Sequence, residues 1–214
     1  PFMHALAPFL AGFPVLISFA VIPFGPPIVT EDRIIKLQLA DLNVGLLYVF
    51  AMGSIAVYGN VIAGWVSNNK FALFGGLRAT AQMISYEITM GLSALGVIVI
   101  YATLNLNEII AYQGQTILGG LLPAWGIFLN PIGFLLFFVS MMAETKRGPF
   151  DLPESESEIV AGYVTEYSGM KFLLFWLGEF SEIVVASALI TILFLGGWQL
   201  PYFDITQVPA DLWG

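Results

Sequence analysis

The sequence predicts an all-α protein, a polytopic bundle of about five transmembrane helices in a single membrane domain. Two observations predict this fold class. Of the 214 residues, 58% are hydrophobic and only 10% are charged, whereas roughly 25% are charged in soluble domains. The mean hydropathy is +0.86, and long uncharged stretches alternate with short polar ones. A surface so poor in charge suits lipid rather than water, which argues against a soluble globule.

The first two spans are the most clearly bounded. Residues 1–30 contain no Asp, Glu, Lys or Arg, and residues 3–24 within them are long enough to cross a bilayer as a helix. The second span, residues 42–66, lies within 28 uncharged residues. It ends beside Trp65, where an aromatic residue suits the membrane interface.

Three further spans are expected. Residues 78–104 are polar in their first half and apolar in their second. Residues 124–143 form the fourth span, with a kink expected at Asn130–Pro131 because proline interrupts helical hydrogen bonding. The fifth span is residues 170–198.

The basic residues predict which end of the bundle faces the cytoplasm. Five spans place the connecting segments alternately at two ends, with five basic residues at one end and two at the other. The positive-inside rule makes the first end cytoplasmic. Its basic residues are Lys70, Arg78, Lys146, Arg147 and Lys171, and those of the opposite end are Arg33 and Lys36.

The composition excludes several classes of function. With 15 acidic and 7 basic residues and a net charge of −8, the chain has no basic surface for nucleic acid. It contains no Cys and only one His, His4, so thiolate chemistry, iron–sulfur ligation, a metal site and a Ser–His–Asp hydrolase are not expected. No glycine-rich phosphate loop is present, so nucleotide binding is unsupported.

The segment from Glu144 to Ser168 carries six acids. One interpretation is a solvated loop, in which Ser155 and Glu158 form a capping box for a short amphipathic helix over residues 156–165. The other is a proton-accepting cluster, because repulsion between carboxylates raises their proton affinity. For Glu156 and Glu158 alone, the solvated loop is favoured. The six acids are Glu144, Asp151, Glu154, Glu156, Glu158 and Glu166.

Three acids lie within the expected spans. Glu87 belongs to the third span, and Glu179 and Glu182 share one face of the fifth because they are three residues apart. An ionised carboxylate in a membrane costs a few kcal/mol, so such residues usually face the bundle interior and mark an ion or proton path. The alternative is a purely structural hydrogen bond between helices.

The third span also carries a polar stripe on the face opposite Glu87. The hydroxyl groups could hydrogen-bond their own helix instead of a neighbour, and Arg78 could reach the interface, whereas Gln82 favours a contact with another helix. The stripe comprises Arg78, Gln82, Ser85, Thr89 and Ser93.

The run from Glu144 to Phe172, beginning E-T-K-R-G-P-F-D-L-P-E, is more specific than these patterns. It closely resembles a signature of the H subunit of proton-pumping NADH:quinone oxidoreductase, respiratory complex I, the counterpart of mitochondrial NADH dehydrogenase subunit 1. The run from Ser67 to Glu87, beginning S-N-N-K-F-A-L-F-G-G-L-R, is similar to the same family's segment that opens the next helix. The resemblance extends from residues 21–25 to residues 193–198, nearly the whole chain.

The resemblance implies an eight-helix subunit, of which this chain holds the second to sixth helices. Such a subunit lies in the prokaryotic inner membrane, forms part of a quinone-binding chamber and starts an acidic path for proton translocation. Quinone is then a substrate, and no cofactor is expected in this chain. Iron–sulfur clusters and flavin belong to partner subunits. The implied partners are an iron–sulfur subunit and a quinone-chamber subunit of the peripheral arm, neighbouring membrane-arm subunits and the lipid bilayer.

The resemblance also assigns roles to individual residues, without a complete catalytic site in this chain. Glu182 stands where many relatives carry an uncharged polar residue, so its role in the proton path rests on its place in the helix. Ser155 stands where the family commonly has Gly. The expected proton-path residues are Glu87, Glu144, Asp151, Glu154, Glu156, Glu158, Glu166, Glu179 and Glu182. Those expected in the quinone chamber or as charge partners are Arg78, Arg147, Phe150 and Trp176.

Three alternatives remain open from the sequence. A homologous subunit of a membrane-bound hydrogenase or a formate hydrogenlyase would use a similar helical bundle without quinone. A stand-alone ion transporter would also explain acids within the membrane, although no inverted repeat is found. The chain could also be a passive docking scaffold.

Overall fold

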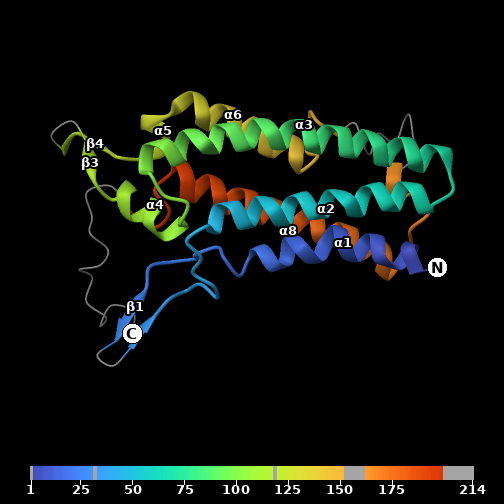
Figure 1. Cartoon of the computed structure of the whole chain (residues 1–214), viewed down its shortest axis with the longest axis horizontal. Coiled ribbons are helices and arrows are strands. Elements are labelled where there is room, and N and C mark those ends of the chain that lie inside the picture. Colours follow the sequence, from blue (N-terminus) through green and yellow to red (C-terminus); the bar gives the residue numbers. More distant parts are fainter. Residues whose placement is uncertain (1, 31–32, 118–119, 152–161, 200–214) are drawn as a thin grey trace.

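The structure, a computed structural model, describes residues 2–30, 33–117, 120–151 and 162–199. In this part of the chain most residues are helical, which confirms the all-α class, and two small antiparallel hairpins complete the fold (Figure 1). The helices are α1 (Phe2–Ser18), α2 (Gly45–Val66), α3 (Lys70–Tyr101), α4 (Leu106–Gln113), α5 (Gly126–Leu129), α6 (Pro131–Glu144), the 3₁₀ helix η2 (Gly162–Val164) and α8 (Met170–Phe194). The strands are β1 (Ile28–Thr30), β2 (Arg33–Ile35), β3 (Thr116–Ile117) and β4 (Leu122–Pro123).

In the part of the chain that the structure describes, three helices are long and apolar enough to cross a membrane, namely α2, α3 and α8. The other two expected spans correspond to shorter apolar helices, α1 and α6. Helix α1 ends at Ser18, and turns continue the chain to Ile22. The expected kink in the fourth span is a break between α5 and α6. There Pro131 occupies the first turn of α6, and the Asn130 side chain caps that helix by accepting from the Gly133 amide.

Three expected boundaries differ from those of the helices by four residues or more, the first being the end of α1 at Ser18 instead of residue 24. Helix α3 begins at Lys70, eight residues before the expected start, because the Asn69 side chain accepts from the Phe71 amide and caps the helix there. Helix α8 ends at Phe194, before residue 198, because the chain leaves it through Gly196 and Gly197, both with positive φ. The hairpins and α4 were not predicted, since these short elements lack a clear hydrophobic period.

Helix α1 packs closely against both α2 and α8, while α3 lies between α2 and α6 (Figure 1). Small residues permit this approach. A Cβ atom on Gly59 of α2 would lie only 2.5 Å from the Ala11 backbone nitrogen, and Gly12 similarly faces Gly178 of α8. The bundle interior is apolar, with side chains such as Leu46 and Leu189 buried in the main core.

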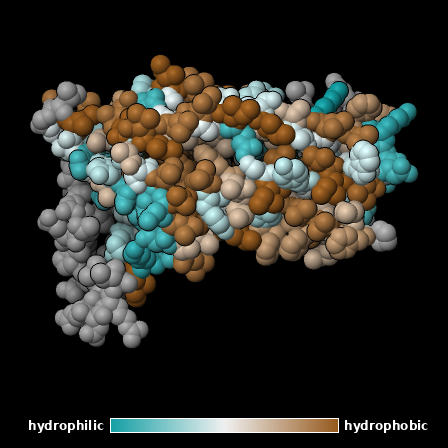
Figure 2. Space-filling model, viewed as in Figure 1, coloured by the Kyte–Doolittle hydropathy of each residue, from teal (hydrophilic) through white to brown (hydrophobic). Residues whose placement is uncertain are grey.

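The outer surface of the bundle suits lipid. Figure 2 shows hydrophobic residues covering much of the helical body, with hydrophilic residues gathered towards its two ends. Val99 is 80% exposed and Trp65 is 75% exposed. Exposure of such apolar side chains to water is unfavourable, whereas lipid solvates them.

Apart from the segment after α6, which lies against Gln82 within α3, the described connecting segments fall into two groups at opposite ends of the bundle (Figure 1). The N-terminus, the α2–α3 turn and η2 lie at one end, where the Asn69 side chain donates to Glu166 at 2.9 Å. The β hairpins and α4 lie at the other end, where Asn105 donates to Asp41 at 3.1 Å. The cytoplasmic orientation of the first end remains a prediction.

Candidate functional site

A partly open cavity between the helices is lined by three carboxylates from three different helices. Glu87 comes from α3, Glu144 from the end of α6, and Glu182 from α8, and the remaining lining side chains are largely apolar. The cavity volume is about 40 Å³. Since roughly 10–15 Å³ suffices for one water molecule, the cavity is large enough to hold water between the carboxylates.

Glu144 has the smallest exposed fraction of these acids. It is only 5% exposed, and its Oε2 atom has no hydrogen-bond partner among the residues that the structure describes. Glu144 also lies within electrostatic range of Glu182, Glu87 and Lys146. A buried carboxylate oxygen without a protein partner is suited to hold a proton or to bind water.

Glu87 is held by a hydroxyl group from the neighbouring helix. Ser54 of α2 forms a short hydrogen bond with the Glu87 carboxylate, and its hydroxyl also lies 3.1 Å from the Phe50 carbonyl oxygen. A serine hydroxyl carries one hydrogen and two lone pairs. Ser54 can therefore donate to ionised Glu87, or donate to Phe50 and accept from protonated Glu87.

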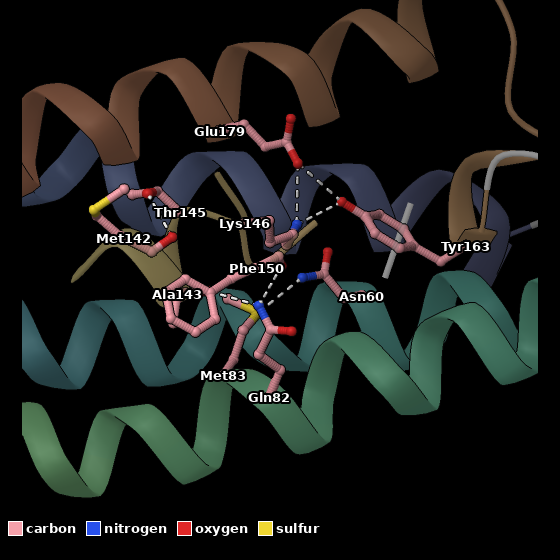
Figure 3. Close-up of polar contacts among 10 residues, drawn as sticks. All are labelled: Asn60, Gln82, Met83, Met142, Ala143, Thr145, Lys146, Phe150, Tyr163 and Glu179. Carbon is pink, nitrogen blue, oxygen red and sulfur yellow. Dashed lines mark hydrogen bonds and ion pairs between the residues drawn. The ribbon is translucent and has the colours of Figure 1, made fainter. Parts of the chain in front are cut away.

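A second, smaller cavity shares Glu182 with the first and is lined by the buried Lys146. Figure 3 shows the Lys146 ammonium between Tyr163 and Glu179. The Lys146 ammonium donates to the Tyr163 hydroxyl at 2.6 Å and forms an ion pair with Glu179 at 3.1 Å. The Tyr163 hydroxyl lies 3.4 Å from the same carboxylate. Glu182 lines both cavities, so it connects this triad to Glu87 and Glu144.

The backbone at the end of α6 turns Lys146 inward. Lys146 has φ of 51°, in the left-handed region that residues other than glycine seldom adopt. Gln82 of α3 fixes the same segment by donating at 2.8 Å to both the Ala143 and Phe150 carbonyl oxygens. The Phe150 ring in turn packs edge-on against Tyr86. The segment after α6 is thus tied to α3 and directs a positive charge into the bundle.

The acids after α6 are only partly placed. Glu154, Glu156 and Glu158 lie outside the described residues, as does the expected amphipathic helix up to residue 161. The described end of that helix forms the 3₁₀ helix η2. Asp151 is exposed, and exposed Glu166 accepts from Asn69. Neither of these two carboxylates lines the two cavities.

All four expected chamber residues, Phe150 included, lie outside the lining of the two cavities. Arg78 and Arg147 are exposed, and Trp176 is 51% exposed on the outer face of α8. Trp176 packs between Phe172 and Phe180, and the Arg147 guanidinium lies 5.2 Å from the centre of the Phe180 ring. These residues form an outward row of aromatic side chains with a cation at one end.

In the polar stripe of α3, some side chains hydrogen-bond their own helix and one contacts another segment, so each of the two interpretations applies to part of it. Ser85 and Ser93 hydrogen-bond carbonyl groups of their own helix, so these hydroxyls are structural. Gln82 joins α3 to the segment after α6, as described above. Glu87, on the other polar face, contacts α2.

Two titratable groups at the ends of the bundle have shifted pKa values. Burial raises the pKa of Tyr167 to about 12, and its ring stacks on His4 with 4.2 Å between centroids. At the opposite end, the hydrogen bond from Lys36 holds the pKa of Asp41 below its ordinary value of 3.8. Both groups stabilise loops and lie away from the cavities.

Sequence reasoning missed three residues of the site, Lys146, Tyr163 and Ser54. From the sequence, Lys146 was interpreted only as one of the basic residues at the cytoplasmic end. Its partners are 17 and 33 residues away, and no helical spacing connects such distant positions. Ser54 offered one signal, a hydroxyl group inside an otherwise apolar span, where polar side chains tend to face other helices. Among the described residues, no group of three or more His, Cys, Asp or Glu is arranged to hold a metal ion.

Comparison with known proteins gives consistent matches over most of the chain. Residues 1–213 match the family model described as NADH dehydrogenase. The chain is 51% identical over 200 residues to the H subunit of NADH-quinone oxidoreductase from Protochlamydia amoebophila, covering 94% of this chain and 59% of the relative. It is 50% identical over 196 residues to the H 2 subunit of the same enzyme from Geobacter sulfurreducens, covering 92% and 57%. With the H 1 subunit from Geobacter metallireducens, the identity is 49% over 208 residues, covering 97% and 59%. The chain thus spans less than two thirds of the length of these relatives.

Proposed function

This chain belongs to the NADH dehydrogenase family, and on that premise we propose that it is part of a membrane subunit of a proton-translocating NADH-quinone oxidoreductase, complex I. Within that complex it contributes to the quinone-binding chamber and couples quinone reduction to proton translocation. The observation that carries the proposal is the cavity lined by Glu87, Glu144 and Glu182. An ionised carboxylate inside a membrane costs about 3 kcal/mol on insertion scales, so three such groups around one cavity require a functional reason.

The carboxylates form a path along which protons can move. Glu179 and Glu182 line the smaller cavity, and Glu182, Glu144 and Glu87 line the larger one. Closely placed carboxylates share protons, so a change of charge at one alters the protonation of the next. Quinone reduction consumes two protons, and that demand at the loop end of the path biases the acids deeper in the bundle.

The quinone chamber is proposed at the loop end, where the apolar and basic side chains face outward. Trp176 and Phe180 present aromatic surface, and Arg147 supplies a cation beside it. Such a surface can hold an apolar ring and orient a carbonyl group. Arg78 and Phe150 are proposed as further members of this region. The chamber is completed by partner subunits of the peripheral arm, which hold the iron–sulfur clusters and the flavin.

The proposal places the chain in the prokaryotic inner membrane as a multi-pass protein, with the segment between α6 and α8 on the cytoplasmic side. The chain forms one membrane domain of a longer subunit, expected to have eight helices. An iron–sulfur subunit and the quinone-chamber subunit of the peripheral arm would contact the segment after α6, and membrane-arm subunits would contact the side of the bundle. The names of the relatives favour NADH-quinone chemistry over the hydrogenase-type alternative.

The proposal is tested by replacing Glu144 and Glu179 with Gln in the intact complex. Each variant keeps the size and a hydrogen-bonding group of the side chain but cannot release a proton. We expect assembled Glu144→Gln and Glu179→Gln complexes to lose most of their quinone-coupled proton pumping in liposomes. The control is Glu108→Gln, which changes an exposed acid of α4 at the opposite end of the bundle. Full quinone reductase and pumping rates in both variants would contradict the proposal and would instead favour a passive scaffold.

A further inference from the structure

Lys146 occupies a junction between the segment after α6 and the acids of the bundle. Its side chain is buried, and its ammonium contacts Tyr163 of η2 and Glu179 of α8 (Figure 3). Among the described residues that line the two cavities, one is basic, Lys146, and four are acidic. One positive charge therefore faces four groups that could each be negative.

Described residues of several elements surround Lys146. Helix α8 contributes Glu179 and Glu182, and η2 contributes Tyr163. Glu144 of α6 lies within electrostatic range, and Glu87 of α3 borders the larger cavity beyond it. The other lining side chains of the smaller cavity are uncharged: Asn60 of α2, Met83 of α3, Ala11 of α1 and others.

The hydrogen bonds of the triad are consistent with one protonation state. Lys146 has donors only, so it donates to both the Tyr163 oxygen and the Glu179 carboxylate. Tyr163 can then donate its own hydrogen to Glu179 at 3.4 Å. Two donors converge on one carboxylate, and this arrangement stabilises Glu179 in its ionised form.

We propose that Lys146 is a positioning residue of the proton path, whose charge keeps Glu179 ionised as the proton acceptor at the loop end. Among the described residues, Lys146 forms an ion pair with Glu179, so the other described acids of the cavities, Glu182, Glu144 and Glu87, hold the protons that move. This inference rests on the proposed function and deepens it by assigning different roles to the acids.

The contact with Tyr163 makes the role of Lys146 sensitive to the loop. Gly162, next to Tyr163, is pressed against Gly75 of α3, where a Cβ atom on Gly75 would lie 2.5 Å from the Gly162 Cα atom. Tyr163 is therefore fixed between α3 and Lys146. A displacement of the loop segment from α3 withdraws the Tyr163 hydroxyl from both Lys146 and Glu179, and thereby changes how well the charge of Glu179 is stabilised.

The test compares Lys146→Met with Lys146→Arg in the intact complex, with Lys70→Met as a control that removes an exposed lysine. Quinone reduction and proton pumping are measured in liposomes as a function of pH. Without the cation, Glu179 favours its protonated form. We therefore expect the pH profile of Lys146→Met to move to higher pH by about one unit or more, while Lys146→Arg and Lys70→Met keep the original profile. An assembled Lys146→Met complex with an unmoved profile would overturn the inference.

A second variant keeps the inference testable if Lys146→Met does not assemble. Tyr163→Phe removes one donor to Glu179 and leaves every formal charge in place. We expect a shift of its profile in the same direction, smaller than one unit, and an unmoved profile would also overturn the inference. If Glu144→Gln and Glu179→Gln abolish pumping while the Lys146 and Tyr163 profiles stay unmoved, the proposed function stands and only this inference fails.

Discussion

Replacing Gly75 with Ala tests how the loop segment is held against the bundle. A Cβ atom at this position would lie 2.5 Å from the Gly162 Cα atom and 2.7 Å from the Tyr163 nitrogen. Both are backbone atoms, so no side-chain rotation can relieve the overlap. Ordinary contact begins at 3.4 Å, so the loop segment must move away by about 0.9 Å. Overpacking of this kind typically costs about 1–3 kcal/mol.

The displacement also has a functional consequence. Tyr163 donates to Glu179 across 3.4 Å, which is close to the limit for a hydrogen bond, so a movement of this size breaks that contact. We expect the pH profile of pumping by the Gly75→Ala complex to shift in the same direction as that of Tyr163→Phe, and the complex to inactivate at a lower temperature than the wild type. Thermal inactivation of quinone reductase activity and the pH dependence of proton pumping in liposomes measure the two effects.

Gly91 provides a matched control in the same helix. A Cβ atom there meets nothing within 4 Å, and alanine stabilises a helix by roughly 0.8–1 kcal/mol relative to glycine. Gly91→Ala is therefore expected to be neutral or slightly stabilising. A Gly75→Ala complex with the stability and the pH profile of the Gly91→Ala complex would refute this reasoning.

Three further predictions concern individual polar contacts. Ser54→Ala removes the hydroxyl that holds Glu87. A hydrogen bond to a charged group contributes about 1.5 kcal/mol, so we expect the rate of proton pumping in liposomes to fall by up to about tenfold. An unchanged pumping rate would contradict this role of Ser54. The lowered pKa of Asp41, due chiefly to Lys36, means that this residue stabilises the folded state above its unfolded pKa near 3.8 and that the contribution disappears as the pH falls through its folded pKa. Asp41→Asn should therefore reduce stability at neutral pH and flatten the acid limb of a thermal-stability profile. Gln113→Leu leaves two backbone amides and a carbonyl inside the bundle without the partner they have now; the expected loss is roughly 2–5 kcal/mol, seen as a lower unfolding temperature, and a wild-type temperature would contradict it.

Much of the fold could be predicted from the distribution of apolar and charged residues. The five apolar stretches all contain helices, and Pro131 marked the break in the fourth. The start of α3 was misplaced because Lys70 and Arg78 frame a short apolar run that is equally consistent with a loop at the interface. Capping by Asn69, which lies outside the hydrophobic pattern, decides where the helix begins.

The acids of the candidate site could be predicted from the sequence, but the residues that contact them could not. Glu179 and Glu182 share a face of α8, as their spacing indicated, and both line the smaller cavity. The positive φ of Lys146 places its ammonium inside the bundle, and nothing in the local sequence signals such a turn at a residue other than glycine. The contact between Ser54 and Glu87 depends on the register of α2 against α3, which only the packed structure defines.

The central claim is that protons move along the carboxylates of the two cavities, and Glu182 is the residue that borders both. The most direct measurement is the number of protons pumped per quinone reduced by an assembled Glu182→Gln complex in liposomes. We expect this ratio to fall to a small fraction of the wild-type value, while the Glu108→Gln control keeps it. A Glu182→Gln complex that pumps with the wild-type ratio would contradict the claim.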